Sequence, residues 1–123
     1  MTVNEQAIAY HANGCNCAQS VLCALSAYTG LDENTAQRIA AGFGGGVRCG
    51  EICGAISGGV MALGMADART ASAKTMQLTG KFRAEHGCVR CQELTQKYGG
   101  KGHCDVMISF AAQAAEAILK ESR

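Results

Sequence analysis

Cysteine is the reactive side chain that this sequence uses in excess, with eight among 123 residues. Two of them, Cys49 and Cys53, lie in one glycine-dense stretch, GFGGGVRCGEICGAISGG, at residues 42–59. Another two, Cys88 and Cys91, have the CxxC spacing that redox dithiols and metal sites share. No βαβ pattern surrounds this CxxC, so thioredoxin is a poor match. The thiols are the first candidates for chemistry.

The apolar spacing predicts an all-α fold, a compact bundle of about five to seven helices with a glycine-rich loop. Three consecutive glycines, Gly44 to Gly46, predict the loop, because each costs roughly 1 kcal/mol in a helix relative to alanine. Met76 and Phe82 are expected to be buried. The expected helices lie near residues 3–12, 17–29, 33–42, 53–66, 71–85, 92–98 and 105–121.

Four cysteines fall at the starts of four different expected helices: Cys17, Cys53, Cys91 and Cys104. A helix N-terminus favours negative charge, so we expect a lowered thiol pKa there. We expect Cys53 to be the attacking thiol, because its glycine-rich surroundings should give access to it. Since a helical bundle brings elements together, these four thiols are our candidates for catalytic residues and for metal ligands.

The remaining four cysteines fall outside this set. Cys15, Cys49 and Cys88 each lie a few residues before one of the four, and could be second ligands, resolving thiols or neither. Of these, Cys49 and Cys88 are possible further metal ligands. Cys23 falls among apolar residues within a helix and is expected in the core. Three histidines also occur: His103 is expected in a surface loop, and His11 and His86 at helix ends.

The glycines near Cys53 predict close approach of another group. Without a β-carbon, Gly44, Gly45, Gly46 and Gly54 are the positions where we expect a bound cofactor to come nearest the backbone. Gly54 and Gly58 lie four residues apart, on one helix face, where a neighbouring helix could pack closely. A phosphate-binding loop is a weak alternative, because no strand precedes the glycines and no Gly-Lys-Ser/Thr follows.

Length and composition restrict the function classes. The chain predicts a single domain over residues 1–123. Its net charge of +1 and aromatic content of 5% argue against nucleic-acid and anionic-membrane partners. We see no signal peptide and expect a cytoplasmic protein, where many cysteines indicate metal-binding or redox activity rather than structural disulfides. The last expected helix is apolar on two faces, so it is either deeply buried or part of a subunit interface. We therefore hypothesise a homodimer.

The motifs, in order, resemble those of the C_GCAxxG_C_C family, whose name is linked to redox activity. The matching segments are Asn16-Cys17-Ala18-Gln19, Gly42-Phe43-Gly44-Gly45-Gly46, Cys53-Gly54-Ala55-Ile56-Ser57-Gly58, Cys91-Gln92-Glu93-Leu94 and Cys104. The resemblance covers nearly the whole chain. It implies a small, mostly helical protein, and it selects Cys17, Cys53, Cys91 and Cys104 as the functional thiols.

Three functions fit these observations. The first is a dithiol–disulfide or electron-transfer protein, with oxidoreductase-like chemistry whose partner is another redox protein or a small thiol. The second is a metal protein in which the four cysteines hold zinc or an iron–sulfur cluster. The third is a helical interaction protein with structural thiols. A hydrolase is disfavoured, because the sequence shows neither paired carboxylates nor a Cys–His nucleophile arrangement.

Overall fold

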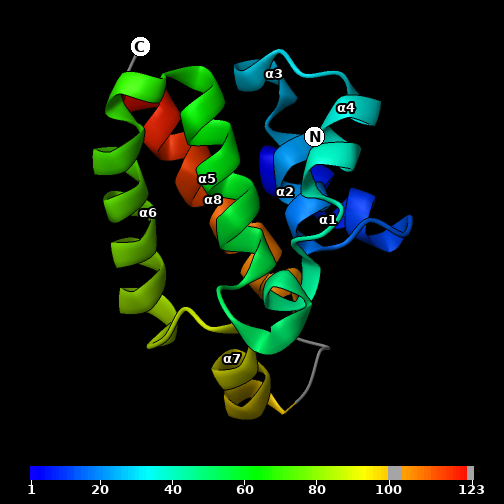
Figure 1. Cartoon of the computed structure of the whole chain (residues 1–123), viewed down its shortest axis with the longest axis vertical. Coiled ribbons are helices and arrows are strands. Elements are labelled where there is room, and N and C mark those ends of the chain that lie inside the picture. Colours follow the sequence, from blue (N-terminus) through cyan, green and yellow to red (C-terminus); the bar gives the residue numbers. More distant parts are fainter. Residues whose placement is uncertain (100–103, 122–123) are drawn as a thin grey trace.

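Short helices joined by brief turns make up the described structure (Figure 1). The computed structural model describes residues 1–99 and 104–121. The all-α expectation is confirmed: these ranges hold seven α-helices of eight residues or more and no β-strand. The α-helices are α1 (Val3–Ala12), α2 (Cys17–Ala24), α3 (Ser26–Thr29), α4 (Glu33–Ala40), α5 (Gly54–Ala66), α6 (Ala71–His86), α7 (Cys91–Tyr98) and α8 (Cys104–Glu121). Two short helical turns, η1 (Gly46–Gly50) and η2 (Ala68–Thr70), lie between them.

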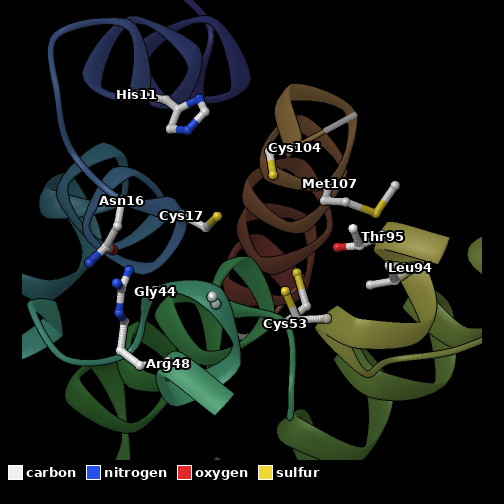
Figure 2. A pocket seen from close by; sticks show the side chains of 13 residues that line it. His11, Asn16, Cys17, Gly44, Arg48, Cys53, Leu94, Thr95, Cys104 and Met107 are labelled. Atoms are coloured by element: carbon white, nitrogen blue, oxygen red, sulfur yellow. The ribbon is translucent and has the colours of Figure 1, made fainter. Parts of the chain in front are cut away.

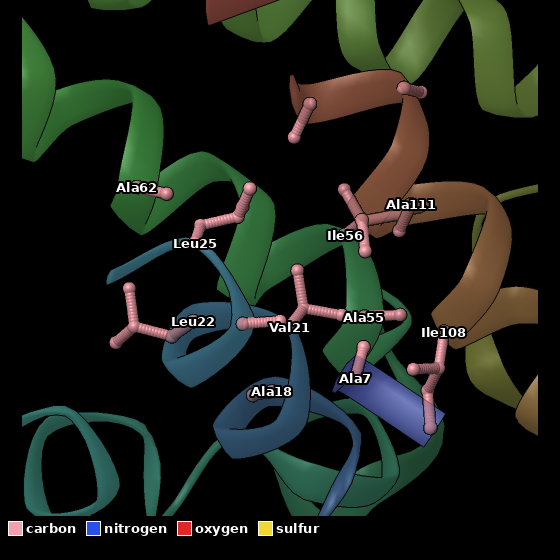
Figure 3. Packing of buried hydrophobic residues seen from close by; sticks show 14 of the residues in the cluster. Ala7, Ala18, Val21, Leu22, Leu25, Ala55, Ile56, Ala62, Ile108 and Ala111 are labelled. Atoms are coloured by element: carbon pink, nitrogen blue, oxygen red, sulfur yellow. The ribbon is translucent and has the colours of Figure 1, made fainter. Parts of the chain in front are cut away.

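Helix α5 lies at the centre of the bundle and packs on α2, α6 and α8. In Figure 1, α6 lies on one side of α5 and α8, whereas α1, α2 and α4 lie on the other. Helix α7 is separate, at the lower end of the view. The core contains many small side chains: Figure 3 shows Ala7, Ala18, Ala55 and Ala111 among larger aliphatic residues. Small residues let the helices approach one another closely.

Side-chain caps explain where three of the helices begin. Thr2 accepts a hydrogen bond from the backbone N–H of Glu5, and the Glu5 carboxylate accepts one in return from the Thr2 N–H. Asn16 and Gln19 form the same reciprocal pair at the start of α2, and Asp32 caps α4. Each cap satisfies N–H groups that have no partner within the helix. The helix starts predicted from the sequence are confirmed here.

Two expectations about the helices were wrong in detail. The helix expected over residues 17–29 breaks at Leu25, so that the chain continues as the separate short helix α3. Met76 is 74% exposed, whereas Phe82 is fully buried as expected. The buried stripe of α6 runs through Lys74, Leu78 and Phe82 at four-residue spacing, and Met76 lies off that stripe.

Helix α8 is apolar on two faces because the chain itself covers both. Ile108, Ala112 and Leu119 are buried together with Met107 and Ala111, and α8 packs against α1, α2, α5 and α6. Burial within one chain therefore accounts for the pattern that suggested a subunit interface. The homodimer remains a prediction, and a monomeric mass in light scattering at micromolar concentration would contradict it. No helix in the described ranges is long and apolar enough to span a membrane.

Helices α2 and α5 pack closely against each other at two glycines. A β-carbon added to Gly58 would lie 2.5 Å from the Ala18 carbonyl oxygen and 3.1 Å from the Val21 Cβ. A β-carbon on Gly54 would lie 3.2 Å from the Cys17 Cβ. The expectation that Gly54 and Gly58 admit a neighbouring helix is confirmed, and the neighbour is α2.

We predict that Gly58→Ala lowers the free energy of unfolding by about 1–3 kcal/mol, because the added methyl group must push α2 away from α5. Gly64→Ala is the matched control. It lies in the same helix, a β-carbon added there would meet nothing within 4 Å, and alanine is the better helix former by about 1 kcal/mol. Urea denaturation followed by circular dichroism measures both. Equal stabilities of the two variants would contradict the close contact.

Candidate functional site

The starts of four helices converge on one cavity of about 230 Å³. Figure 2 shows side chains from α1, α2, α5, α7, α8 and the glycine loop around it. All four cysteines selected from the sequence line this cavity: Cys17, Cys53, Cys91 and Cys104. The other lining residues are His11, Asn16, Gly44, Gly45, Arg48, Gly54, Leu94, Thr95 and Met107.

Each of the four thiols sits at a helix start, as expected. Cys17 follows the capping residue Asn16 and is the first residue of α2. Cys53 is itself the N-cap of α5. Cys91 and Cys104 are the first residues of α7 and of the described part of α8. Four elements distant in sequence thus bring one thiol each to the cavity.

A single β-bridge orders the part of the cavity that holds Cys53 and Cys91. Ile52 and Arg90 form an antiparallel bridge. The Cys53 N–H donates to the Val89 carbonyl at 2.8 Å, and the Cys91 N–H donates to the Glu51 carbonyl at 2.6 Å. Side chains alternate between the two faces along a strand, so the residues next to a bridged pair all point to the face opposite that pair. Cys53 and Cys91 are therefore diagonal neighbours on one face, and that face borders the cavity.

Cys17 and Cys104 interact directly. Their thiols are hydrogen-bonded to each other, and this contact is the largest cause of the raised pKa of Cys17. Burial and the proximity of Cys53 and Cys91 raise the Cys17 pKa further. Cys17 is therefore a neutral thiol near pH 7.

The predicted low pKa of Cys53 was wrong. Burial raises the pKa of this thiol to about 11, although hydrogen bonds from the backbone N–H groups of Ala55 and Ile56 act in the opposite direction. The N-terminal amides of α5 thus face the sulfur as the helix-start argument required. Cys53 is only 5% exposed, so loss of solvation outweighs them. The expected accessibility of Cys53 was wrong for the same reason.

The other four cysteines do not line the cavity. Cys23 lies in the core at 2% exposure, as expected, and burial raises its pKa to about 11. Cys15 is half-buried. Of the two possible further ligands, Cys49 is exposed and its thiol contacts the Gly46 carbonyl oxygen, whereas Cys88 contacts the His86 carbonyl oxygen. The structure therefore does not add Cys49 or Cys88 to the four.

At most of the glycines where we expected a cofactor, other residues of the protein fill the space beside the backbone. A β-carbon on Gly44 would meet the Asn16 side chain at 2.7 Å, and one on Gly46 would meet the Glu51 backbone at 2.5 Å. Gly44, Gly45 and Gly54 line the cavity, whereas Gly46 does not. Binding of a cofactor at these glycines stays a prediction.

Two ionisable residues that line the cavity, His11 and Arg48, were not selected from the sequence. The His11 Nδ1 lies 2.9 Å from an Asp105 carboxylate oxygen, although these residues are 94 positions apart, so no local motif could reveal the pair. His11 was expected only to lie at a helix end, and it is the second-last residue of α1. Arg48 belongs to the glycine loop, which the sequence did single out. His103 lies outside the described residues.

The loop that carries Arg48 has a left-handed backbone. Gly45, Gly46, Val47 and Arg48 all have φ between 59° and 66°. For residues with a β-carbon this conformation costs about 1–2 kcal/mol each, and Val47 is β-branched. The surrounding structure therefore imposes this turn, which places Arg48 on the cavity wall.

The donor set has the right chemistry for a metal but not a ready geometry. Four cysteine sulfurs suit zinc or an iron–sulfur cluster. Within residues 1–99 and 104–121, however, no three His, Cys, Asp or Glu side chains are grouped so that they could hold one ion. Binding of a metal by Cys17, Cys53, Cys91 and Cys104 would require the side chains to move together.

The fold and the cavity define a cysteine-rich, all-α protein whose thiols surround one site. Comparison with protein families agrees: residues 15–118 match the family described as "Putative redox-active protein (C_GCAxxG_C_C)". Because this match covers most of the chain, the protein belongs to the C_GCAxxG_C_C family, as the motifs indicated. Searches of curated proteins and of solved structures give no significant match.

The raised pKa of Cys53 predicts slow alkylation of the reduced protein. At pH 7.5, a pKa of about 11 instead of about 8.5 lowers the thiolate fraction about 300-fold. A thiolate of higher pKa is more nucleophilic, which offsets part of this loss of reaction rate. We therefore expect Cys53 in the native protein to react with iodoacetamide at least about tenfold more slowly than in urea.

This difference should narrow as the pH rises toward 11, because more of the native thiol is then ionised. Peptide mass spectrometry measures each cysteine separately. Exposed Cys49 is the internal control and should react at similar rates in the native and unfolded protein. A native Cys53 rate that reaches a plateau near pH 7 would contradict the raised pKa.

Proposed function

We propose that this protein is a thiol–disulfide redox protein whose reacting thiols are Cys17, Cys53, Cys91 and Cys104. The observation that carries this proposal is the convergence of these four thiols, and of no other cysteine, on one cavity. Membership in a family described as redox-active supports it. Thiols that were merely structural would have no reason to gather at helix starts around an opening.

The contacts support two dithiol pairs. Cys17 and Cys104 are hydrogen-bonded, and Cys53 and Cys91 occupy one face of the bridged segments. Each pair would cycle between two thiols and one disulfide.

The reaction balances with an external disulfide as oxidant. A cysteine thiolate attacks one sulfur of that disulfide, forms a mixed disulfide and releases the first half as a thiol. The paired cysteine then attacks the protein sulfur of the mixed disulfide and releases the second half. Two electrons and two protons pass from the cysteine pair to the acceptor.

Cys104 is the better attacker in this scheme. It is half-buried rather than buried like Cys53, whereas its partner Cys17 has a strongly raised pKa and is the weaker attacker near pH 7. Cys17 would then be the resolving thiol. The sequence favoured Cys53 as attacker because of its supposed access, and its 5% exposure removes that argument.

His11 is suited to accept the thiol proton. An ionised carboxylate can only accept a hydrogen bond, so the neutral His11 ring donates from Nδ1 to Asp105, which leaves the lone pair on Nε2. In Figure 2 the His11 ring lies above Cys17 and to the left of Cys104, on the same side of the cavity. His11 is also the one base among the described lining residues. Asp105 would position the ring.

The proposal that the four thiols form two disulfides predicts which cysteines become linked on oxidation. Mild oxidation with diamide should give Cys17–Cys104 and Cys53–Cys91 disulfides, which dithiothreitol reverses, because these thiols are neighbours in the cavity. Peptide mapping without reduction identifies the links. In Cys104→Ser the Cys53–Cys91 link should persist, whereas the control Cys49→Ser should keep both links. Links that scramble among all eight cysteines, or no reversible oxidation, would favour structural thiols instead.

We predict that His11→Gln slows oxidation by small disulfides at pH 7 by about a hundredfold, the lower range for loss of a general base. Asp105→Asn should slow it less, because the ring is present but less well held. Stopped-flow measurement of thiol loss gives both rates. The deficit of His11→Gln should disappear near pH 10, where hydroxide removes the proton. If the oxidation rate of His11→Gln were lowered by the same factor at every pH, His11 would act only on the stability of the fold and not as a base.

A metal site is the second candidate, favoured by four sulfur donors around one cavity. Zinc or an iron–sulfur cluster would use the same four cysteines and would stabilise their thiolates. Its test is the metal content and visible spectrum of protein purified without oxygen. Stoichiometric zinc or iron, lost together in any of the four Cys→Ser variants but retained in Cys23→Ser, would replace the dithiol proposal.

A further inference from the structure

We propose that the substrate of this cavity is a small disulfide that carries a carboxylate group, and that Arg48 binds that carboxylate. This inference rests on the proposed thiol–disulfide function and names its substrate class. Three observations lead to it: the position of Arg48, the charge around the cavity, and the depth of the thiols.

Arg48 is held at the cavity by an imposed backbone conformation. Its φ of 60° follows three other left-handed residues in the loop. In Figure 2 its side chain extends along the cavity wall toward Asn16, on the side away from Met107 and Thr95. Arg48 is exposed, and the strained loop nevertheless fixes it on the cavity wall.

The Arg48 guanidinium has no partner of its own within residues 1–99 and 104–121: it enters none of the ion pairs or side-chain hydrogen bonds found there. Two carboxylates close in sequence to the cavity cysteines are engaged in ion pairs. Asp105 binds His11, and Glu51 binds Arg90 at 3.0 Å. None of the described lining residues is acidic. The cavity therefore offers an unpaired guanidinium, the group best suited to a carboxylate.

The depth of the thiols favours a small molecule over a protein partner. Cys53 is 5% exposed, and Cys17, Cys91 and Cys104 are half-buried. The cavity of about 230 Å³ admits part of a small disulfide, whereas a disulfide on a folded protein surface would have to be extruded to reach these sulfurs. The exchange reaction is the one written above, with Arg48 orienting the entering half and with two electrons and two protons passing to the small disulfide.

Three small disulfides of similar shape test this inference: dithiodipropionate is anionic, bis(2-hydroxyethyl) disulfide is neutral and cystamine is cationic. Each disulfide is mixed with the fully reduced protein at pH 7 and low salt, and the rate of loss of free thiols is measured. Each rate is divided by the rate of the same disulfide with dithiothreitol, which removes differences in intrinsic reactivity. We expect the normalised rate for dithiodipropionate to exceed that for cystamine by about tenfold or more, as for one charge-assisted contact.

The variants identify the residue responsible. Arg48→Gln should lower the anionic-to-neutral rate ratio by about tenfold, and Arg48→Lys should retain most of it, since the charge remains. Arg38→Gln is the matched control, because Arg38 on α4 is exposed like Arg48 but does not line the cavity. Its ratio should equal that of the unaltered protein.

Equal normalised rates for the three disulfides, or a preference that survives Arg48→Gln, would overturn the inference and leave the proposed function intact. Oxidation by a protein disulfide such as oxidised thioredoxin, with none by the small disulfides, would overturn the small-molecule assignment alone. Failure of every disulfide to oxidise the cavity thiols would overturn both.

Discussion

The close contact between α2 and α5 is the constraint on which the cavity depends. At Gly54, a β-carbon would lie 2.9 Å from the Phe43 carbonyl oxygen and 3.2 Å from the Cys17 Cβ. Only a residue without a side chain lets α2 come this near the start of α5. The contact therefore places Cys17 beside the helix start that Cys53 caps. The glycine loop, α7 and α8 then complete the wall with Cys91 and Cys104.

Burial governs the chemistry of the thiols more strongly than the helix starts do. The N–H groups of Ala55 and Ile56 favour a Cys53 thiolate, yet burial raises its pKa to about 11. The pKa of Cys17 is raised by its thiol neighbour as well as by burial. Cys17 and Cys53 are therefore neutral thiols near pH 7. Reaction then requires that a thiol lose its proton, which is why a base such as His11, or a metal that displaces protons, gains importance at this site.

The sequence contained enough local information to find the four thiols. Helix starts depend on caps a few residues away, such as Asn16 with Gln19, and the apolar residues of α5 and α8 lie in long uninterrupted stretches. The same reasoning could not find the pairing of His11 with Asp105, because tertiary packing alone joins residues so far apart. It also misjudged Cys53, since the degree of burial depends on how α2 and the glycine loop close over α5.

The position of Arg48 could be predicted from the sequence only in part. Its place in a glycine-rich loop was evident, but glycine can adopt many conformations, so the left-handed turn through Val47 could not be foreseen. Cys49 and Cys88 illustrate the reverse. Their nearness in sequence to Cys53 and Cys91 made them plausible ligands, and the turn and the end of α6 direct them elsewhere.

The electron-accepting capacity of the fully oxidised protein tests the proposed function most directly. Anaerobic titration with a dithiol reductant counts the electrons that the protein takes up. Two cavity disulfides predict four electrons for the unaltered protein and for Cys49→Ser, and two for Cys104→Ser. A Cys104→Ser variant that still accepts four electrons, or an unaltered protein that accepts none, would contradict the assignment of the cavity thiols as two redox pairs.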